Sequence, residues 1–153
     1  MFDIPSVRIG RVFGIPVEVN LSWFVIFGLL TFSLSTVVFA SLEEAQGASS
    51  VLLTVVSMLT ALAFFGSILA HEVCHSLVAR AFGGTVDRIT LFIFGGVSNI
   101  AHESENPQDE FLIAVVGPLS SLALAGLFWL GLQAAPNDTG PLGALLFYLA
   151  VVN

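Results

Sequence analysis

Two histidines and one glutamate lie within a single five-residue segment, His71-Glu72-Val73-Cys74-His75. On an α-helix, residues four positions apart lie on the same face, so His71 and His75 can bind one metal ion together. Glu72 lies about 100° around the helix from His71, beside the metal, where it can take a proton from water. This pattern predicts zinc-assisted hydrolysis, in which the metal polarises a carbonyl group and Glu72 is the general base.

The surroundings of this segment are strongly apolar. Of the 153 residues, 56% are hydrophobic and 10% are charged, whereas a soluble domain carries about a quarter charged residues. From Val51 to Ala79 the ionisable side chains are Cys74 and the three residues of the metal pattern. About 20 apolar residues span a bilayer, and ionisable groups inside a span are costly unless they function. We therefore expect the metal to lie inside the membrane, within about 14 Å of Arg80, where the span ends.

The helices and strands that we expect to position this site indicate a mainly α, polytopic membrane protein. Its fold would consist of three complete transmembrane helices and the start of a fourth, with two short β-hairpins flanking spans one and two. We expect one transmembrane catalytic-core domain, incomplete at its C-terminus. Its predicted parts are a hairpin at 1–20, span one at 21–40, span two at 51–79, a hairpin at 85–100, span three at 111–132 and the start of span four at 141–153.

Glycines mark the turns of both hairpins. The first hairpin is expected to turn at Gly10-Arg11 or at Phe13-Gly14. In the second, Gly95-Gly96 is the natural turn or bulge. An exposed strand of this second segment could hold an unwound substrate segment by β-augmentation, and its two largely apolar faces suit re-entry into the membrane. Gly95 and Gly96 are therefore candidate substrate-binding residues, with a purely structural hairpin as the alternative.

The start and one face of span three are also predictable. Asn106 and Pro107 are typical of a helix start, as N-cap and first helical residue. Gly117, Ser121 and Ala125 recur every four residues, which indicates a small-residue face that serves close helix packing. A proline that follows the first of these small residues is expected to kink the helix.

Arginines predict the orientation in the membrane. Arg8 and Arg11 precede span one, Arg80 and Arg88 follow span two, and the loops after spans one and three contain no arginine. Because positive residues concentrate in cytoplasmic loops, the N-terminus and the mouth of the active site are expected to be cytoplasmic.

Several partner classes and roles can be set aside. The net charge of −7 argues against nucleic acid, which requires a basic face. The single cysteine, Cys74, excludes an internal disulfide, and we expect it to pack against a neighbouring helix. His102 is expected to be a solvated loop residue. The first five residues lack the basic and apolar regions of a cleaved signal peptide.

Four landmarks in this order resemble the site-2 protease family of intramembrane zinc metalloproteases, especially the prokaryotic members that carry paired cystathionine-β-synthase domains. The landmarks are Phe13-Gly14-Ile15-Pro16-Val17, the zinc motif, Phe94-Gly95-Gly96-Val97, and Gly117-Pro118-Leu119-Ser120-Ser121. The resemblance covers nearly the whole chain.

The resemblance implies one Zn²⁺ per active site, with His71 and His75 as ligands and Glu72 as catalytic base. It also implies a prokaryotic cell membrane and transmembrane protein substrates, such as membrane-tethered transcription factors or anti-sigma factors. The third ligand of the family is an aspartate in a Leu-Asp-Gly motif, which this chain lacks. Asp109 and Glu110 fall near the membrane interface, so we expect the third ligand beyond Asn153 and no activity in the isolated chain.

Two other interpretations stay open at this point. One is a multipass metal-binding or zinc-transport protein, although spans one and three contain no histidine, aspartate or glutamate. The other is a homologue that has lost its zinc chemistry. Replacing Glu72 by glutamine distinguishes them, because it removes proton transfer and leaves metal binding and transport intact.

Overall fold

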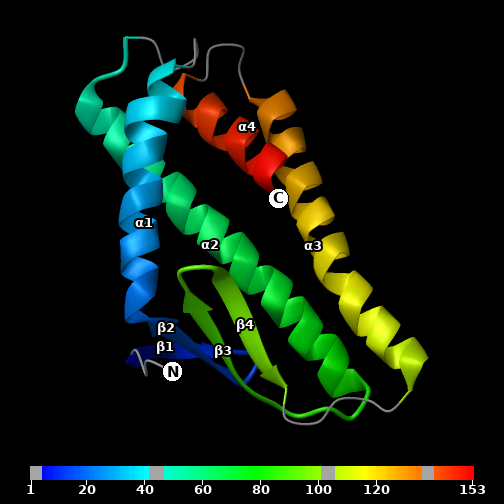
Figure 1. Cartoon of the computed structure of the whole chain (residues 1–153). Helices are drawn as coiled ribbons and strands as arrows, with labels where there is room; N and C mark the ends of the chain where they lie inside the picture. Colours follow the sequence, from blue (N-terminus) through cyan, green and yellow to red (C-terminus); the bar gives the residue numbers. More distant parts are fainter. Residues whose placement is uncertain (1–4, 42–46, 101–105, 136–139) are drawn as a thin grey trace. The chain divides into compact units, whose positions relative to one another are not determined.

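The computed structural model describes residues 5–41, 47–100, 106–135 and 140–153. His102, Glu103 and Asp138 therefore lie outside the described residues. The elements, drawn in Figure 1, are β1 (Ser6–Val12), β2 (Ile15–Asn20), α1 (Leu21–Ser33), η1 (Leu34–Val38), η2 (Phe39–Ser41), α2 (Ser50–Ala81), β3 (Val86–Phe92), β4 (Gly95–Ile100), α3 (Pro107–Ala134) and α4 (Pro141–Val152).

Three of the helical segments are long and apolar enough to cross a bilayer. They cover Leu21–Ser41 with 21 residues, Ser50–Ala81 with 32 and Pro107–Ala134 with 28, whereas α4 is a shorter apolar helix. The three predicted spans are thus confirmed, and the chain is a membrane protein. The predicted cap also holds, because Asn106 Oδ1 accepts a hydrogen bond of 3.1 Å from the Gln108 amide at the start of α3.

The chain divides into two compact units, which are described separately. The sheet unit consists of Met1–Val25 and Ser67–Ser121, and the helical unit consists of Ile26–Gly66 and Leu122–Asn153. The long helices run from one unit into the other, so each unit contains a part of α1, α2 and α3.

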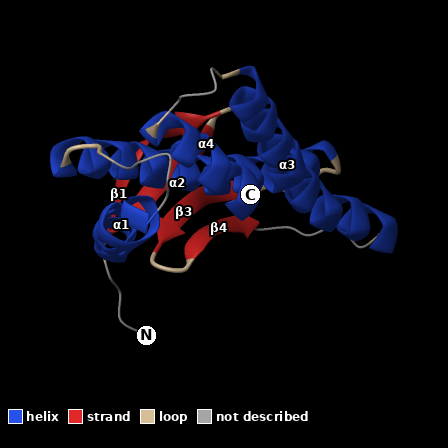
Figure 2. Cartoon of the chain, turned by 90° about the horizontal axis from the view of Figure 1, so that it is seen from above, coloured by secondary structure: helices blue, strands red, loops and turns tan. Residues whose placement is uncertain are grey.

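In the sheet unit, the two predicted hairpins join into one sheet with the strand order β1-β2-β3-β4 (Figure 2). The hairpins themselves are antiparallel, and β2 pairs in parallel with β3 where Val17 lies opposite Ile89. Alternate residues of these central strands are buried, as the two-residue period of a strand requires. They are Ile15, Val17, Val19, Ile89 and Leu91.

The first hairpin turns at Phe13-Gly14, where both residues have positive φ (48° and 81°), as a tight two-residue turn requires. The alternative at Gly10-Arg11 is wrong, because Gly10 lies inside β1, next to a shift in register. The second hairpin does not turn at Gly95-Gly96 either. Its turn lies before Gly95, which already pairs with Phe92, and its register shift lies at the far end of β3.

The sheet packs against the C-terminal part of α2 through a small apolar core. Ile15, Val73 and Ile89 are buried together, with Leu69 and Leu77 of α2 packed against them. Figure 1 shows the β3–β4 hairpin running alongside this part of the helix. Polar contacts fix the margin of the sheet. Arg80 Nη1 donates to the Phe13 carbonyl at 2.9 Å, and the Ile93 amide donates to Ser22 Oγ at 3.2 Å.

The helical unit is held together by apolar packing. Its buried core consists of Leu34, Phe39, Ala61 and Ala144, and the Phe39 ring meets Tyr148 edge to face at 6.3 Å. The hydroxyl groups of Ser35 and Thr36 both donate to the Phe32 carbonyl, at 3.0 and 2.8 Å. Such side-chain bonds compete with the helical ladder, and the helix widens to a π-helix at η1.

Candidate active site

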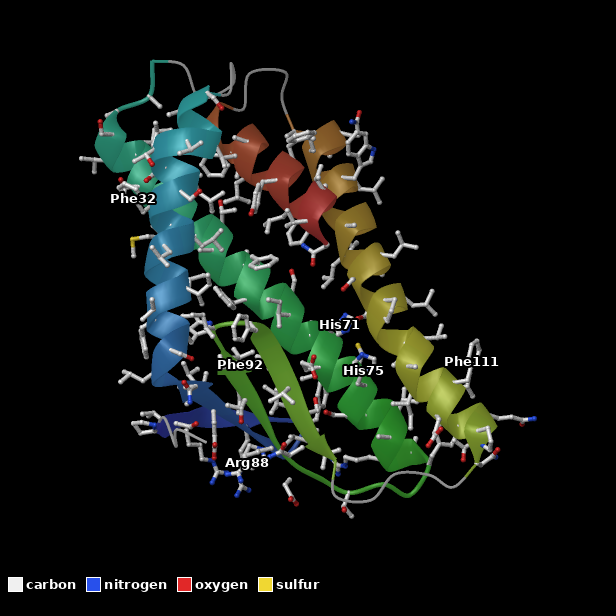
Figure 3. The ribbon with its side chains drawn as sticks, viewed as in Figure 1. Phe32, His71, His75, Arg88, Phe92 and Phe111 are labelled. Carbon is white, nitrogen blue, oxygen red and sulfur yellow. The ribbon has the colours of Figure 1, made fainter. Side chains whose placement is uncertain are left out.

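The two histidines of the zinc motif lie in the C-terminal third of α2, inside the sheet unit. Their Nε2 atoms face each other at 3.0 Å, and the rings meet at a steep angle with centroids 4.7 Å apart. Figure 3 shows both side chains on the side of α2 that faces α3. The one-face geometry predicted from the spacing of four residues is therefore present.

The outer ring nitrogens are both held by α3. His75 Nδ1 lies 2.6 Å from the Ile113 carbonyl, which can only accept, so Nδ1 carries the proton and donates it. The neutral ring then presents the Nε2 lone pair toward His71. His71 Nδ1 lies 3.0 Å from Ser121 Oγ, a hydroxyl that can accept in the same way. Metal-binding histidines are fixed by such bonds, which set the tautomer and the ring orientation.

The histidine pair fits a zinc ion. Two nitrogens about 2.0–2.1 Å from a tetrahedral zinc are about 3.3 Å apart, close to the 3.0 Å between the two Nε2 atoms. No group of three or more metal-binding side chains forms among residues 5–41, 47–100, 106–135 and 140–153. Within this described part of the chain, His71 and His75 are a pair whose ring nitrogens could hold a metal ion. Cys74 is a free, partly buried thiol.

Gly117 allows α3 to approach the histidines closely. A Cβ atom at this position would lie 2.6 Å from His71 Nε2 and would overlap the His75 ring, so only glycine fits. The interpretation of the small-residue stripe of span three as packing alone is too narrow, because Gly117 and Ser121 both contact the zinc-motif histidines. The four-residue spacing placed them on one face, but nothing in the sequence indicated that this face meets His71 and His75.

Glu72 points to the sheet instead of to α3. Ser98 Oγ, on β4, donates to Glu72 Oε2 at 2.7 Å. A Cβ at Gly96 would lie 2.7 Å from Glu72 Cγ, so the glycine lets β4 approach the glutamate. At Gly95 a Cβ would meet nothing within 4 Å, but the φ of 127° disfavours other residues. The structure thus brings Gly96 to the site, and Ser98 was not foreseen because its sequence context marks it only as one polar residue in a strand.

Comparison with known proteins finds relatives of this chain. The model of peptidase family M50 matches residues 59–148, which include the zinc motif, Gly96, Ser98 and all of α3. A protein assigned as a zinc metalloprotease in Synechocystis sp. is 41% identical over 97% of this chain and 40% of its own length. The Rip3 protein of Mycobacterium tuberculosis, also assigned as a zinc metalloprotease, is 37% identical over 80% of this chain and 30% of its own.

A solved structure shows the same fold. The site-2 protease from Methanocaldococcus jannaschii superposes with a TM-score of 0.58 at 24% identity, over 97% of this chain and 63% of that protein. The present chain spans 40% or less of the length of the two curated relatives described above. The family model matches more than half of the chain and contains the zinc motif in full. The resemblance to the site-2 protease family is thereby confirmed, without a test of the likeness to members that carry cystathionine-β-synthase domains, and the chain belongs to peptidase family M50.

Proposed function

We propose that the protein is a zinc-dependent endopeptidase that hydrolyses peptide bonds within or near transmembrane segments of other membrane proteins. The observation that carries this proposal is the histidine pair of α2. Its Nε2 atoms face each other at 3.0 Å, and α3 holds both outer nitrogens. A metal-binding pair inside an apolar helix of 32 residues supports hydrolysis at membrane depth.

Each residue has a distinct part in the reaction. A zinc ion held by His71 and His75 would supply Lewis acidity at the scissile carbonyl. Glu72 takes the proton of the attacking water and gives it to the leaving amine, so that the new carboxylate and amine separate. Ser121 and the Ile113 carbonyl hold the imidazoles in the orientation that binds metal.

The substrate must be unwound before it is cleaved, because a helix hides its peptide bonds in its own hydrogen bonds. β4 is an edge strand of the sheet, and Gly96 and Ser98 bring it against Glu72. A substrate segment paired with this edge by β-augmentation would lie beside the general base. Gly95 and Gly96 are the residues we assign to this pairing, and membrane-tethered regulatory proteins are the substrates we propose.

A third protein ligand is needed to complete a catalytic zinc site. We place it on residues that follow Asn153, in a catalytic-core domain to which residues 1–153 belong. Zinc affinity of the 1–153 chain, measured beside a version that extends through the next aspartate, tests this placement. Equal affinity and equal peptidase activity of the two would contradict it.

The orientation rests on the arginines. Arg80 and Arg88 contact the β1–β2 hairpin, through the Phe13 carbonyl at 2.9 Å and Glu18 at 3.6 Å, so all four arginines belong to the sheet unit. We propose that this unit faces the cytoplasm of a prokaryotic cell. Single cysteines at Thr85 and Ala48, beyond the two ends of α2, should react with impermeant reagents from opposite sides. Reaction from the same side would overturn the topology.

Replacement of Glu72 by glutamine tests the proposed reaction. The assay uses the full-length protein and a reporter peptide, which carries a fluorophore and a quencher around one apolar helix, in a helical form and in a form unwound by prolines. Glu72→Gln should lower kcat by about 100- to 10,000-fold for both forms and should keep the zinc content of the wild type. Cleavage at the wild-type rate, or no cleavage of either form by the zinc-loaded wild type, would contradict the proposal.

A further inference from the structure

A chain of two hydroxyl groups ends on the carboxylate of Glu72. Ser76 Oγ, on α2, lies 3.2 Å from Ser98 Oγ, and Ser98 Oγ lies 2.7 Å from Glu72 Oε2. Ser98 Oγ is also 3.4 Å from the Glu72 carbonyl, but each hydroxyl has one proton to donate. The short contact to the carboxylate is the charge-assisted one, so the proton of Ser98 goes to Oε2 and Ser98 accepts from Ser76.

The burial of Ser76 makes its hydrogen bond to Ser98 necessary. Ser76 is fully buried, with 0% of its surface exposed, and a buried hydroxyl without a partner would be destabilising. Ser98, on β4, thus accepts a hydrogen bond from Ser76 and donates its own proton to Glu72, two residues of α2. On β4, Gly96 and Ser98 lie two residues apart and share a face. Gly96 lets the strand come close to Glu72, and Ser98 makes the bond.

We propose that Ser98, supported by Ser76, is a positioning residue for Glu72. The inference rests on the proposed role of Glu72 as general base. A glutamate side chain has three rotatable bonds, and a fixed Oε2 leaves Oε1 as the oxygen that meets the attacking water. Because Ser98 belongs to β4, the strand that we assign to substrate pairing also orients the base. The geometry of the base therefore depends on the position of this strand.

The test measures kcat, KM and zinc content of full-length variants with the reporter peptide. Ser98→Ala should lower kcat by about 10- to 100-fold, the loss expected for one hydrogen bond to a charged group, with KM and zinc content within twofold of the wild type. Ser98→Thr keeps the hydroxyl on a strand-forming residue and should restore kcat to within about threefold. Ser35→Ala, which removes a hydroxyl that donates to a backbone carbonyl of the helical unit, is the control and should change none of the three values.

A double variant separates positioning from packing. Because Ser76 acts through Ser98, Ser76→Ala should lower kcat by about threefold in the wild type and should have no further effect in Ser98→Ala. If Ser98→Ala does not accumulate as folded protein, Ser98→Cys, a nearly isosteric and weaker donor, should show an intermediate kcat.

Wild-type kcat in Ser98→Ala, or a loss that Ser98→Thr does not restore, would overturn the inference. Loss of zinc together with kcat would do the same, because it would indicate a structural role. These results differ from a failure of the proposed function, which would appear as activity in Glu72→Gln.

Discussion

Two fully buried hydroxyl groups, one in each unit of the protein, bond in different ways. In the helical unit, Thr60 is fully buried, and its hydroxyl donates to Val56, one turn earlier in the same helix, at 2.8 Å. In the sheet unit, Ser76 is equally buried, but its hydroxyl reaches a different element and bonds to Ser98. A bond within one helix is satisfied wherever the helix forms, whereas a bond between elements requires a particular tertiary arrangement.

The two halves of α2 differ in a similar way, because one half is apolar and the other contains polar side chains that need partners. Its N-terminal half, Ser50–Gly66, contains no ionisable side chain, and its C-terminal half contains His71, Glu72, His75 and Arg80. In a membrane the apolar half needs only neighbours that fit its shape, because the backbone N–H and C=O groups are hydrogen-bonded within the helix itself. The polar half needs partners, and α3 and β4 provide them. Substitutions in the sheet unit should therefore damage chemistry, and those in the helical unit should damage stability.

The largest effect is expected at Gly117. Gly117→Val would place side-chain atoms inside the His75 ring and 2.6 Å or less from His71 Nε2, and packed interiors do not yield by that much. α3 would have to move away and take Ser121 and Ile113 with it. Activity on the reporter peptide should fall by at least about 100-fold, and zinc should be lost. Gly126→Val on the same helix, where a Cβ meets nothing within 4 Å, is the control; if both variants behave alike, α3 does not support the site.

A smaller effect is expected at Gly96, because it contacts the base and not the zinc ligands. A Cβ there would lie 2.7 Å from Glu72 Cγ and 3.2 Å from Ile68 Cγ2, so Gly96→Ala should displace Glu72. We expect kcat to fall by about 10-fold, as when a residue that supports a functional group is changed, while zinc content stays at the wild-type level. Gly10→Ala on β1, with nothing within 4 Å, is the matched control. Loss of zinc in Gly96→Ala would show that β4 also supports the histidines.

The smallest effect on activity is expected at Phe39. This residue is fully buried in the core of the helical unit, so Phe39→Ala should lower the free energy of unfolding by roughly 3 kcal/mol. Thermal unfolding in detergent measures this loss. At a temperature where the variant is folded, kcat and zinc content should equal those of the wild type. A variant that is folded and has lost its zinc would contradict the claim that the helical unit affects stability and the sheet unit affects chemistry.

Local patterns in the sequence predicted the helices and the zinc motif and offered Phe13-Gly14 as one of two candidate turns, because each of these features depends on neighbouring residues. Apolar runs define the spans, and a spacing of four residues places His71 and His75 on one face. The parallel pairing of Val17 with Ile89 joins segments far apart in the chain, and no local pattern encodes it.

The prediction of a turn or bulge at Gly95-Gly96 was wrong for the same reason, because it took no account of contacts between segments that are far apart in the chain. Glycine is required at position 96 by the close approach of Glu72, which belongs to another element, whereas the sequence alone indicated a turn or a bulge. Ser98 and Ser121 were likewise unpredictable as site residues, since a serine bonds to whatever the fold brings near it. The residues that we propose to carry the chemistry could be named from their types and spacing, whereas those that contact them required the structure.

The most direct test of the account is the zinc content of the full-length protein. The central claim is that His71 and His75 hold the metal, with their Nε2 atoms 3.0 Å apart and their outer nitrogens fixed by α3. Purified wild type and Cys74→Ala should each contain about one zinc per chain, measured by mass spectrometry of the metal after gel filtration. His71→Ala and His75→Ala should each lose nearly all of it, because either change leaves a single imidazole. Full zinc content in both histidine variants would contradict the account.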